Sequence, residues 1–320
     1  MAGFHPTPVD MGHDVWSIDL YEQKIPYRTS AYLIRDEKLT LVETGSALAR
    51  DTLISSLAAL GIQPADLDYV IVTHIHLDHA GGAGHFMELA PNATLVVHPL
   101  GARHMADPAK LWAGTGQVYG DRLTKLFGSI RPVPADRILV RNHGETLDIG
   151  RRTLTFLDSP GHAKHHFTIL DSLANVLYAG DAVGIRYRTG FTGWDFEWVM
   201  PSTPPIDFDP VAIHSTMDML EQIPFEFVYH AHFGRSEKWE AIRETRRCGD
   251  ELAALIQRVY HPGIAVDEVI VALREWIVAD LKKQGHKPGA NIEVLDFDVV
   301  LDALGLMYYE GKRREVEANA

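Results

Sequence analysis

The sequence is poor in cysteine and in long apolar runs. Its single cysteine, Cys248, cannot form a disulfide bond within the chain, and a lone thiol is typical of a reducing compartment. No apolar stretch approaches the roughly 18 residues that a membrane-spanning helix needs, and the polar stretch 1–14 lacks the pattern of a signal peptide. These absences predict a cytoplasmic protein that does not enter a membrane.

Basic charge is also scarce. The net charge is −13 at pH 7, and the basic residues form only one short run, Lys312–Arg314. A surface that binds nucleic acid needs Lys and Arg to neutralise phosphates, so the composition argues against nucleic acid as a partner. We expect a small-molecule substrate instead.

Three common catalytic motifs are missing as well. The sequence has no Gly-x-Ser-x-Gly nucleophile motif, no phosphate-binding P-loop and no dinucleotide fingerprint. Cys248 lies in a charged, helical stretch, so a thiol nucleophile is not expected. With 46% hydrophobic and 23% charged residues, the 320-residue chain has an ordinary globular composition and is long enough for a large domain with an appendage.

The sequence is rich, however, in metal-ligand side chains at one place. The stretch Thr73–Gly82 reads THIHLDHAGG and follows a β-branched apolar run that is typical of a buried strand. If the strand stays extended through His76, then His74 and His76 point to the same side, while Asp78 and His79 lie on a turn before a single following helix. Burying these groups without a cation would be costly, so the pattern predicts metal binding. Two ligand pairs that leave one strand end in different directions suit two ions better than one.

Three later strand ends carry further candidates. His162 follows a predicted strand in a Ser-Pro-Gly-His turn, and Asp181 follows another strand directly after a glycine. His232 stands two residues before Gly234 at the end of a third strand. His230 competes with His232, because side chains two residues apart on a strand point to the same side.

The surrounding pattern alternates strands and helices. Apolar residues predict a hairpin of strands at 31–34 and 39–42, a helix at 48–60 and a strand at 69–72. The segment 107–137 contains several Gly and Pro breaks and aromatic side chains, and we interpret it as an irregular insertion. It is either a wall of the substrate pocket or a loop folded on the surface.

The composition changes after residue 235. Three amphipathic helices are predicted at 236–260, 266–283 and 297–314, and they carry no clustered ligand types. We expect a catalytic domain at 1–235 and a helical C-terminal extension at 236–320 packed on it. The extension caps the site, mediates a homodimer or serves as simple scaffold, and the sequence leaves these three roles open.

Taken in order, the motifs resemble those of the metallo-β-lactamase superfamily. They are THIHLDH at 73–79, Pro-Gly-His at 160–162, Gly-Asp at 180–181 and His-Phe-Gly at 232–234. The similarity covers about residues 15–235. The resemblance implies an α/β (α+β) fold, a four-layer αββα sandwich with the site at one edge of two packed sheets, followed here by a C-terminal helical appendage.

The resemblance also implies a ligand set. One metal is held by His74, His76 and His162, the second by Asp78, His79 and His232, and Asp181 bridges both. The aspartate that the family usually has before Thr-Gly is Glu43 here, at a supporting position rather than at a ligand. Histidine and carboxylate ligands suit two divalent ions, with zinc expected first and iron or manganese as alternatives.

Two adjacent dications can share a hydroxide whose pKa they lower, and one of them can polarise a carbonyl oxygen. Asp78 is the expected catalytic residue, because its counterpart in the family is thought to orient this hydroxide and receive its proton. We therefore expect a binuclear hydrolase of an ester-type bond, a thioester or a lactone, as in the glyoxalase II-like and lactonase branches. β-Lactam hydrolysis is disfavoured.

Three alternatives stay open. The first is a phosphodiesterase that acts on a small nucleotide or another phosphodiester. The second is a redox di-iron protein of the flavodiiron kind, a branch that carries Glu where His76 stands. The third is a ligand-sensing or partner-binding protein with vestigial hydrolysis.

Aromatic residues that follow Asp181 are candidates for the substrate pocket, namely Tyr187, Phe191 and Trp194. Such a run is as often core or lid packing as a pocket wall. The remaining histidines, among them His165 and His166, are interpreted as structural.

Overall fold

The computed structural model describes residues 6–286 and 291–319, and it divides the chain into two compact units. The first unit comprises residues 1–158, 165–180 and 224–236, and the second comprises residues 159–164, 181–223 and 237–320. The expected domain boundary at residue 235 stays a prediction. The second compact unit contains the C-terminal helices together with the internal segments 159–164 and 181–223.

The first unit contains two sheets. The first sheet has seven strands in chain order: β1 (Val9–Gly12), β2 (Val15–Asp19), β3 (Ser30–Ile34), β4 (Thr40–Val42), β5 (Tyr69–Ile71), β6 (Thr94–Val97) and β7 (Ile138–Val140). Strands β1 to β4 pair antiparallel, and β4 to β7 pair parallel. The predicted hairpin is confirmed as β3 and β4, with Leu33 opposite Leu41.

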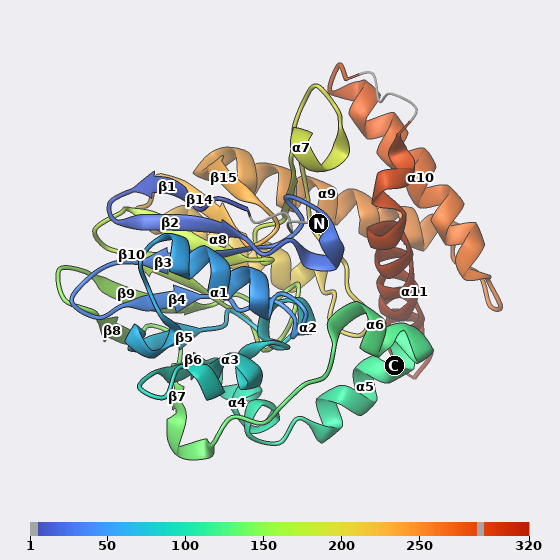
Figure 1. Ribbon diagram of the computed structural model, residues 1–320. Helices are drawn as coiled ribbons and strands as arrows, with labels where there is room; N and C mark the ends of the chain where they lie inside the picture. The colour runs from blue at the N-terminus through green and yellow to red at the C-terminus, as the bar shows by residue number, and fades with distance from the viewer. Residues whose placement is uncertain (1–5, 287–290, 320) are drawn as a thin grey trace. The chain divides into compact units, whose positions relative to one another are not determined.

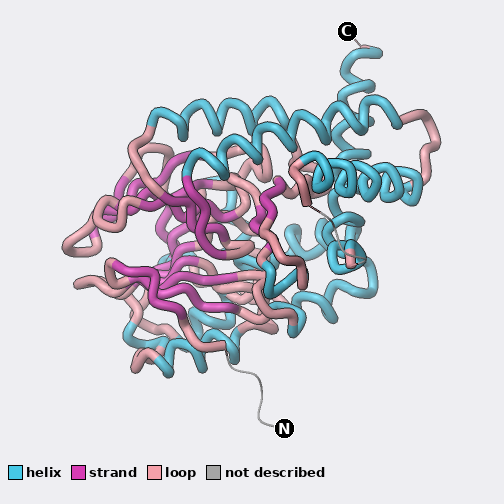
Figure 2. The backbone as a smooth tube through the Cα atoms, turned by 90° about the horizontal axis from the view of Figure 1, so that it is seen from above, coloured by secondary structure: helices cyan, strands magenta, loops and turns pink. Residues whose placement is uncertain are grey.

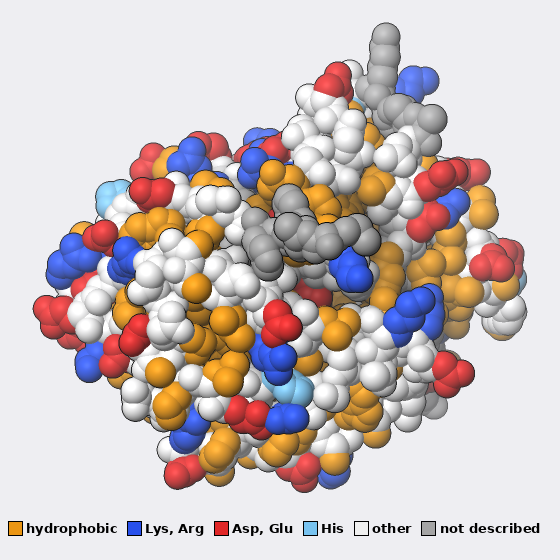
Figure 3. Space-filling model, viewed as in Figure 1, with side chains coloured by type: hydrophobic (Ala, Val, Ile, Leu, Met, Phe, Trp, Pro, Cys, Tyr) orange, Lys and Arg blue, Asp and Glu red, His pale blue; other side chains and the backbone are white. Residues whose placement is uncertain are grey.

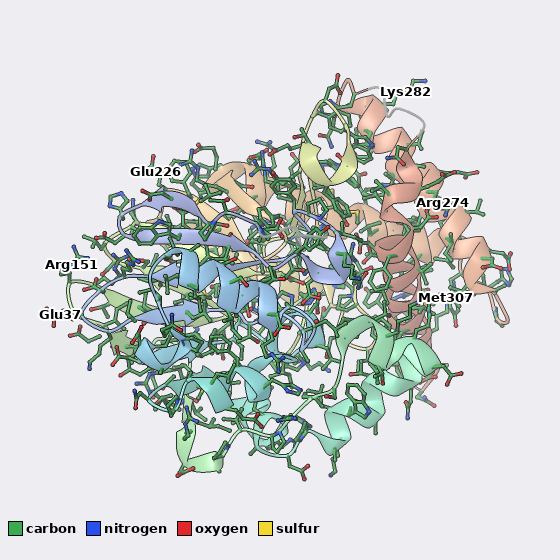
Figure 4. All side chains as sticks on the ribbon, in the orientation of Figure 1. Glu37, Arg151, Glu226, Arg274, Lys282 and Met307 are labelled. Atoms are coloured by element: carbon green, nitrogen blue, oxygen red, sulfur yellow. The ribbon has the colours of Figure 1, made fainter. Side chains whose placement is uncertain are left out.

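The second sheet has six strands in the order β15-β14-β11-β10-β9-β8. Their bounds are β8 (Thr146–Asp148), β9 (Thr153–Asp158), β10 (Phe167–Asp171), β11 (Val176–Gly180), β14 (Phe227–His230) and β15 (Gly234–Glu237). Figure 2 shows the strands of the two sheets, in magenta, stacked on one another. The short turns at Glu37 and Arg151 lie at the end of the unit opposite α2 (Figures 1 and 4).

Alternation along the strands creates a helix–sheet–sheet layering within this unit. Ile71 of β5 faces the second sheet and packs in one core with Phe156 and Phe167. Its neighbour Val70 points to the opposite face, where it shares a second core with residues of three helices. These helices are α1 (Arg50–Ala59), α3 (Ala83–Leu89) and α4 (Pro99–Ala106).

The structure corrects two expectations around the ligand cluster. Strand β5 ends at Ile71, so the chain is not extended through His76, and the single predicted helix is two short ones, α2 (Leu77–Ala80) and α3. The break falls at Gly81 and Gly82, whose φ angles of −61° and −81° are helical. Gly82 allows a close approach of two backbone segments, because a Cβ at this residue would lie 2.7 Å from the carbonyl oxygen of Ser46.

The expected irregular insertion at 107–137 is largely helical, which is a third correction. It contains α5 (Ala109–Tyr119) and α6 (Leu123–Phe127). Leu123 and Phe127 form a small apolar cluster with Leu77, and Trp112 of α5 packs against it. The helical pattern escaped prediction because two glycines interrupt the apolar stripe of α5.

The second unit combines a hairpin with four longer helices. The hairpin strands β12 (Ile185–Tyr187) and β13 (Trp198–Met200) flank the short helix α7 (Thr189–Thr192). The longer helices are α8 (Pro210–Gln222), α9 (Lys238–Val259), α10 (Val266–Lys283) and α11 (Asp296–Ala318), and the last three confirm the predicted C-terminal helices. Among the described residues, no helix is both long enough and apolar enough to span a membrane.

Buried polar contacts join the C-terminal helices to the segment 181–223. Asp302 of α11 accepts hydrogen bonds from the backbone N–H and the hydroxyl of Thr203, at 2.6 and 3.0 Å. Asp280 of α10 accepts one from the indole of Trp198, at 3.2 Å. These contacts join α10 and α11 to the segment 181–223, which belongs to the same compact unit as the three C-terminal helices.

Candidate metal centre

Four candidate ligands lie close together where β5 gives way to α2. His74 and His79 are completely buried. The ring centroid of His74 lies 4.5 Å from that of His76 and 4.1 Å from that of His79. His76 immediately precedes α2, and Asp78 and His79 lie in its single turn, so a short helix presents the second pair of ligands beside the first.

His232, which is 153 residues further along the chain than His79, completes a triangle of ligand atoms. Its Nε2 lies 3.2 Å from Nε2 of His79 and 3.3 Å from Oδ2 of Asp78. Nε2 of His79 lies 3.7 Å from the same oxygen. Tetrahedral zinc with donors at about 2.1 Å places those donors about 3.4 Å apart, so the three atoms fit one face of a metal coordination sphere.

The environment of His232 fixes which ring nitrogen faces the triangle. Its Nδ1 donates to the carbonyl oxygen of Arg28, at 2.7 Å. The proton therefore resides on Nδ1, which leaves Nε2 with the lone pair that a metal ligand requires. The competing His230 is excluded from the triangle, because its Nε2 lies 2.7 Å from the hydroxyl oxygen of Ser236.

Glu43 occupies a supporting position beside His79. Its Oε1 accepts a hydrogen bond from the hydroxyl of Thr73, and a longer one from the Thr73 N–H at 3.3 Å. The same oxygen lies 3.5 Å from Nδ1 of His79. A carboxylate at this nitrogen favours the tautomer with Nδ1 protonated, and so directs Nε2 of His79 toward the triangle.

His162 and Asp181 belong to the second unit. Nε2 of His162 lies 3.5 Å from Oδ2 of Asp181, and both side chains are buried. The turn that carries His162 depends on Gly161, which has a φ of +127°. A Cβ at Gly161 would lie 2.8 Å from the backbone nitrogen of Ile213 at the start of α8, so only glycine fits there.

The predicted pocket residues Tyr187, Phe191 and Trp194 also lie in the second unit. The ring of Tyr187 lies 6.0 Å from Phe191 and 5.7 Å from Trp198, and Trp194 stacks on Phe196 at 5.0 Å. The structure thus gathers them into one aromatic cluster. Their role as a pocket wall stays a prediction.

Two residues near the ligands were not singled out from the sequence. The buried ring of His166 stacks on His74 at 4.7 Å, and the ring of His165 lies 5.3 Å from that of His76. Burial lowers the pKa of His165 to about 3, so its ring is neutral. Their position three and four residues after His162 was the available signal.

Glu22 is a third residue that was not expected from the sequence. Its carboxylate is buried and accepts hydrogen bonds from the N–H and hydroxyl of Ser46, at 2.5 and 2.9 Å. Burial raises the pKa of Glu22 to about 7, and the charge of Asp78 contributes in the same direction.

Comparison with known proteins identifies the family. Residues 25–232 match the model of the metallo-β-lactamase superfamily, so the chain belongs to this superfamily. The metallo-β-lactamase fold-containing protein ST1585 from Sulfurisphaera tokodaii is 26% identical over 214 residues, which are 66% of this chain and 75% of that protein. The solved structure of ST1585 matches 92% of this chain and 98% of its own, with a TM-score of 0.62 and 21% identity. The predicted fold class is therefore confirmed.

Two further relatives have named activities but cover less of the chain. The N-acyl homoserine lactonase AttM from Azorhizobium caulinodans is 37% identical over 118 residues, 37% of this chain and 40% of that protein. The rubredoxin-oxygen oxidoreductase from Megalodesulfovibrio gigas is 30% identical over 130 residues, 41% of this chain and 27% of that protein. This chain therefore spans less than half the length of either relative.

Proposed function

We propose that the chain is a binuclear metal-dependent hydrolase that cleaves an ester-type carbonyl, in a thioester or a lactone. The observation that carries the proposal is the triangle of Asp78, His79 and His232, whose ligand atoms lie 3.2 to 3.7 Å apart. Family membership supports the coarser statement, because the superfamily consists mainly of metal-dependent hydrolases.

In this proposal Asp78, His79 and His232 would hold the second ion, and His74, His76 and His162 would hold the first. Asp181 would be the ligand that the two ions share. The support for His162 and Asp181 is their motif positions and their mutual distance of 3.5 Å. Zinc is the proposed metal, with iron and manganese as alternatives, since His and carboxylate ligands suit all three.

Bound dications at such a site lower the pKa of water and polarise a carbonyl oxygen. The residues of the chain supply the rest. The carboxylate of Asp78 is one-third exposed, so it can accept the proton of the attacking water while His79 and His232 are held in place by Glu43 and the Arg28 carbonyl. Cys248 takes no part, since burial strongly raises the pKa of its thiol.

The choice of an ester-type bond rests on a relative with a named activity, on charge and on His76. The lactonase relative favours a lactone, although it aligns with only 118 residues. Acidic and basic side chains are interspersed on the face that Figure 3 shows, so the described residues of this face form no basic patch for a nucleic acid. The negative net charge of the chain suits a small uncharged substrate in the cytoplasm better than RNA. His76 favours hydrolysis over the redox alternative, which expects Glu at this position.

The experiment combines metal analysis with a substrate panel. The purified chain is expected to hold two metals and to hydrolyse thioesters or lactones faster than bis-(p-nitrophenyl) phosphate. His76→Ala should lose hydrolysis, and Asp181→Asn should lose the paired metals. Full turnover by His76→Ala would reject the metal-dependent mechanism. Preferential cleavage of the phosphodiester would reject only the choice of an ester-type bond.

A further inference from the structure

The turn that carries His232 is held by a distant stretch of the first sheet, Arg28–Tyr32. Ser30 donates from its backbone nitrogen to the carbonyl oxygen of Ala231, at 2.7 Å. Its hydroxyl lies 3.0 Å from the carbonyl oxygen of His230 and 3.1 Å from that of Ala231. The backbone just before His232 is therefore bound by side-chain and main-chain groups of β3 and not only by its own sheet.

Tyr32 spans the same turn from one side to the other. Its hydroxyl donates to the carbonyl oxygen of His230 at 2.5 Å and lies 3.4 Å from that of Gly234. These carbonyls belong to the second residue before His232 and the second residue after it. One buried hydroxyl thus contacts both ends of the five-residue segment that has the ligand at its centre.

The position of this hydroxyl is fixed by packing of the Tyr32 ring. The ring stacks on Tyr229 and tilts against Tyr178, each with centroids 5.4 Å apart. Ser30 and Tyr32 are both at most 1% exposed. Water cannot readily replace their hydrogen bonds, so loss of either hydroxyl weakens the hold on the buried carbonyl oxygens beside His232.

We propose that Tyr32, supported by Ser30, is a positioning residue for His232 and thereby sets the affinity of the metal that Asp78, His79 and His232 hold. The inference rests on the proposed binuclear centre. Tyr32 acts through backbone carbonyls and is not one of the proposed ligands. It fixes the backbone so that Nδ1 of His232 meets the Arg28 carbonyl and Nε2 meets the triangle.

The chain offers a matched control in Tyr229. Its ring belongs to the same aromatic cluster, but its hydroxyl is 3.4 Å from the carbonyl oxygen of Met11 and contacts no part of the His232 turn that the structure describes. Tyr32→Phe and Tyr229→Phe therefore remove the same atom from the same core. Only the first change should affect metal binding.

The test measures metal retention by the full chain. Wild type and both variants are loaded with Zn²⁺ or Co²⁺, dialysed against graded chelator, and assayed for metals per chain and for the Co²⁺ visible spectrum. Tyr32→Phe should bind one of two metals about 10- to 100-fold more weakly, with the other retained. Tyr229→Phe should match wild type, and Ser30→Ala should weaken the same metal to a smaller degree.

The outcomes separate this inference from the proposed function. Two metals of unchanged affinity in both Tyr32→Phe and Ser30→Ala would overturn the positioning role and leave the binuclear centre intact. Equal weakening in Tyr32→Phe and Tyr229→Phe would also overturn it, because the effect would then belong to the core as a whole. A wild type that binds no metal would overturn both proposals. If Tyr32→Phe does not fold, Ser30→Ala alone decides.

Discussion

Nε2 of His79 lies 3.2 Å from Nε2 of His232. Nδ1 of His232 donates to a carbonyl oxygen, and Nδ1 of His79 lies 3.5 Å from the Glu43 carboxylate, an arrangement that favours a lone pair on Nε2 in both rings. Two buried lone pairs at this distance repel each other unless a cation lies between or beside them. This pair is therefore the strongest physical argument, within the first unit, for a metal at the triangle.

His232→Ala should remove one metal and lower hydrolytic turnover by at least about 100-fold. Loss of a ligand should have a larger effect than loss of a residue that hydrogen-bonds to a ligand, which typically costs about 10- to 100-fold. His230→Ala is the matched control. It removes the contact with Ser236 and should cost about 1–3 kcal/mol of stability while both metals remain bound. Metal content after dialysis, measured with the unfolding free energy, checks both. Metal loss only in His230→Ala would reverse the assignment.

Glu43→Gln should keep the shape of the side chain but remove the charge that orients His79 and Thr73. We expect metal affinity to fall about 10-fold or more. Glu37→Gln makes the same chemical change at an exposed position at the far end of the unit (Figure 4) and should have no effect. Competition with a chromogenic chelator measures both affinities, and equal affinities would remove Glu43 from its supporting role.

Asp302 makes stability depend on pH. Burial raises the pKa of Asp302 from 3.8 to about 7 despite the hydrogen bonds from Thr203. Between these two pH values, the carboxyl group is protonated in the folded state and ionised in the unfolded state. Its contribution to stability is present below about pH 4 and is lost as pH rises to about 7, by up to about 4 kcal/mol. Relative to wild type, Asp302→Asn should therefore gain stability across this range.

Urea unfolding at pH 5 and pH 8 measures this difference. The control is Asp267→Asn, an exposed aspartate at the start of α10 in the same unit. Parallel pH curves for wild type and Asp302→Asn would show that the Asp302 carboxyl is ionised in the folded protein.

Gly114→Ala should stabilise α5. The glycine lies inside the helix, and nothing would lie within 4 Å of an added Cβ, so the substitution should gain about 0.5–1 kcal/mol from reduced backbone entropy. Gly120 has equally open surroundings but a φ of +54°. Gly120→Ala should therefore destabilise by about 1 kcal/mol, and opposite shifts in the urea midpoint would confirm the contrast.

The sequence predicted the local features well. The hairpin of β3 and β4, the three C-terminal helices and the grouping of His74 to His79 all depend on neighbours in the chain. The choice between His230 and His232 could not be made from spacing. It depends on the Arg28 carbonyl and the Ser236 hydroxyl, and Arg28 is about 200 residues away. The helices in the segment 107–137 were not predicted, because Gly114 and Gly116 interrupt the apolar periodicity of α5. Packing against Leu77, which is distant in the sequence, stabilises this region.

The hydrogen bond from His232 to Arg28 joins residues 204 positions apart. On the ribosome, Arg28 emerges long before His232 is synthesised, and the triangle does not exist until both are present. Under the proposed function, an ion held by all three side chains would bind only after near-complete synthesis of the first unit. For most of translation, Asp78 and His79 are present while His232 has not yet been made.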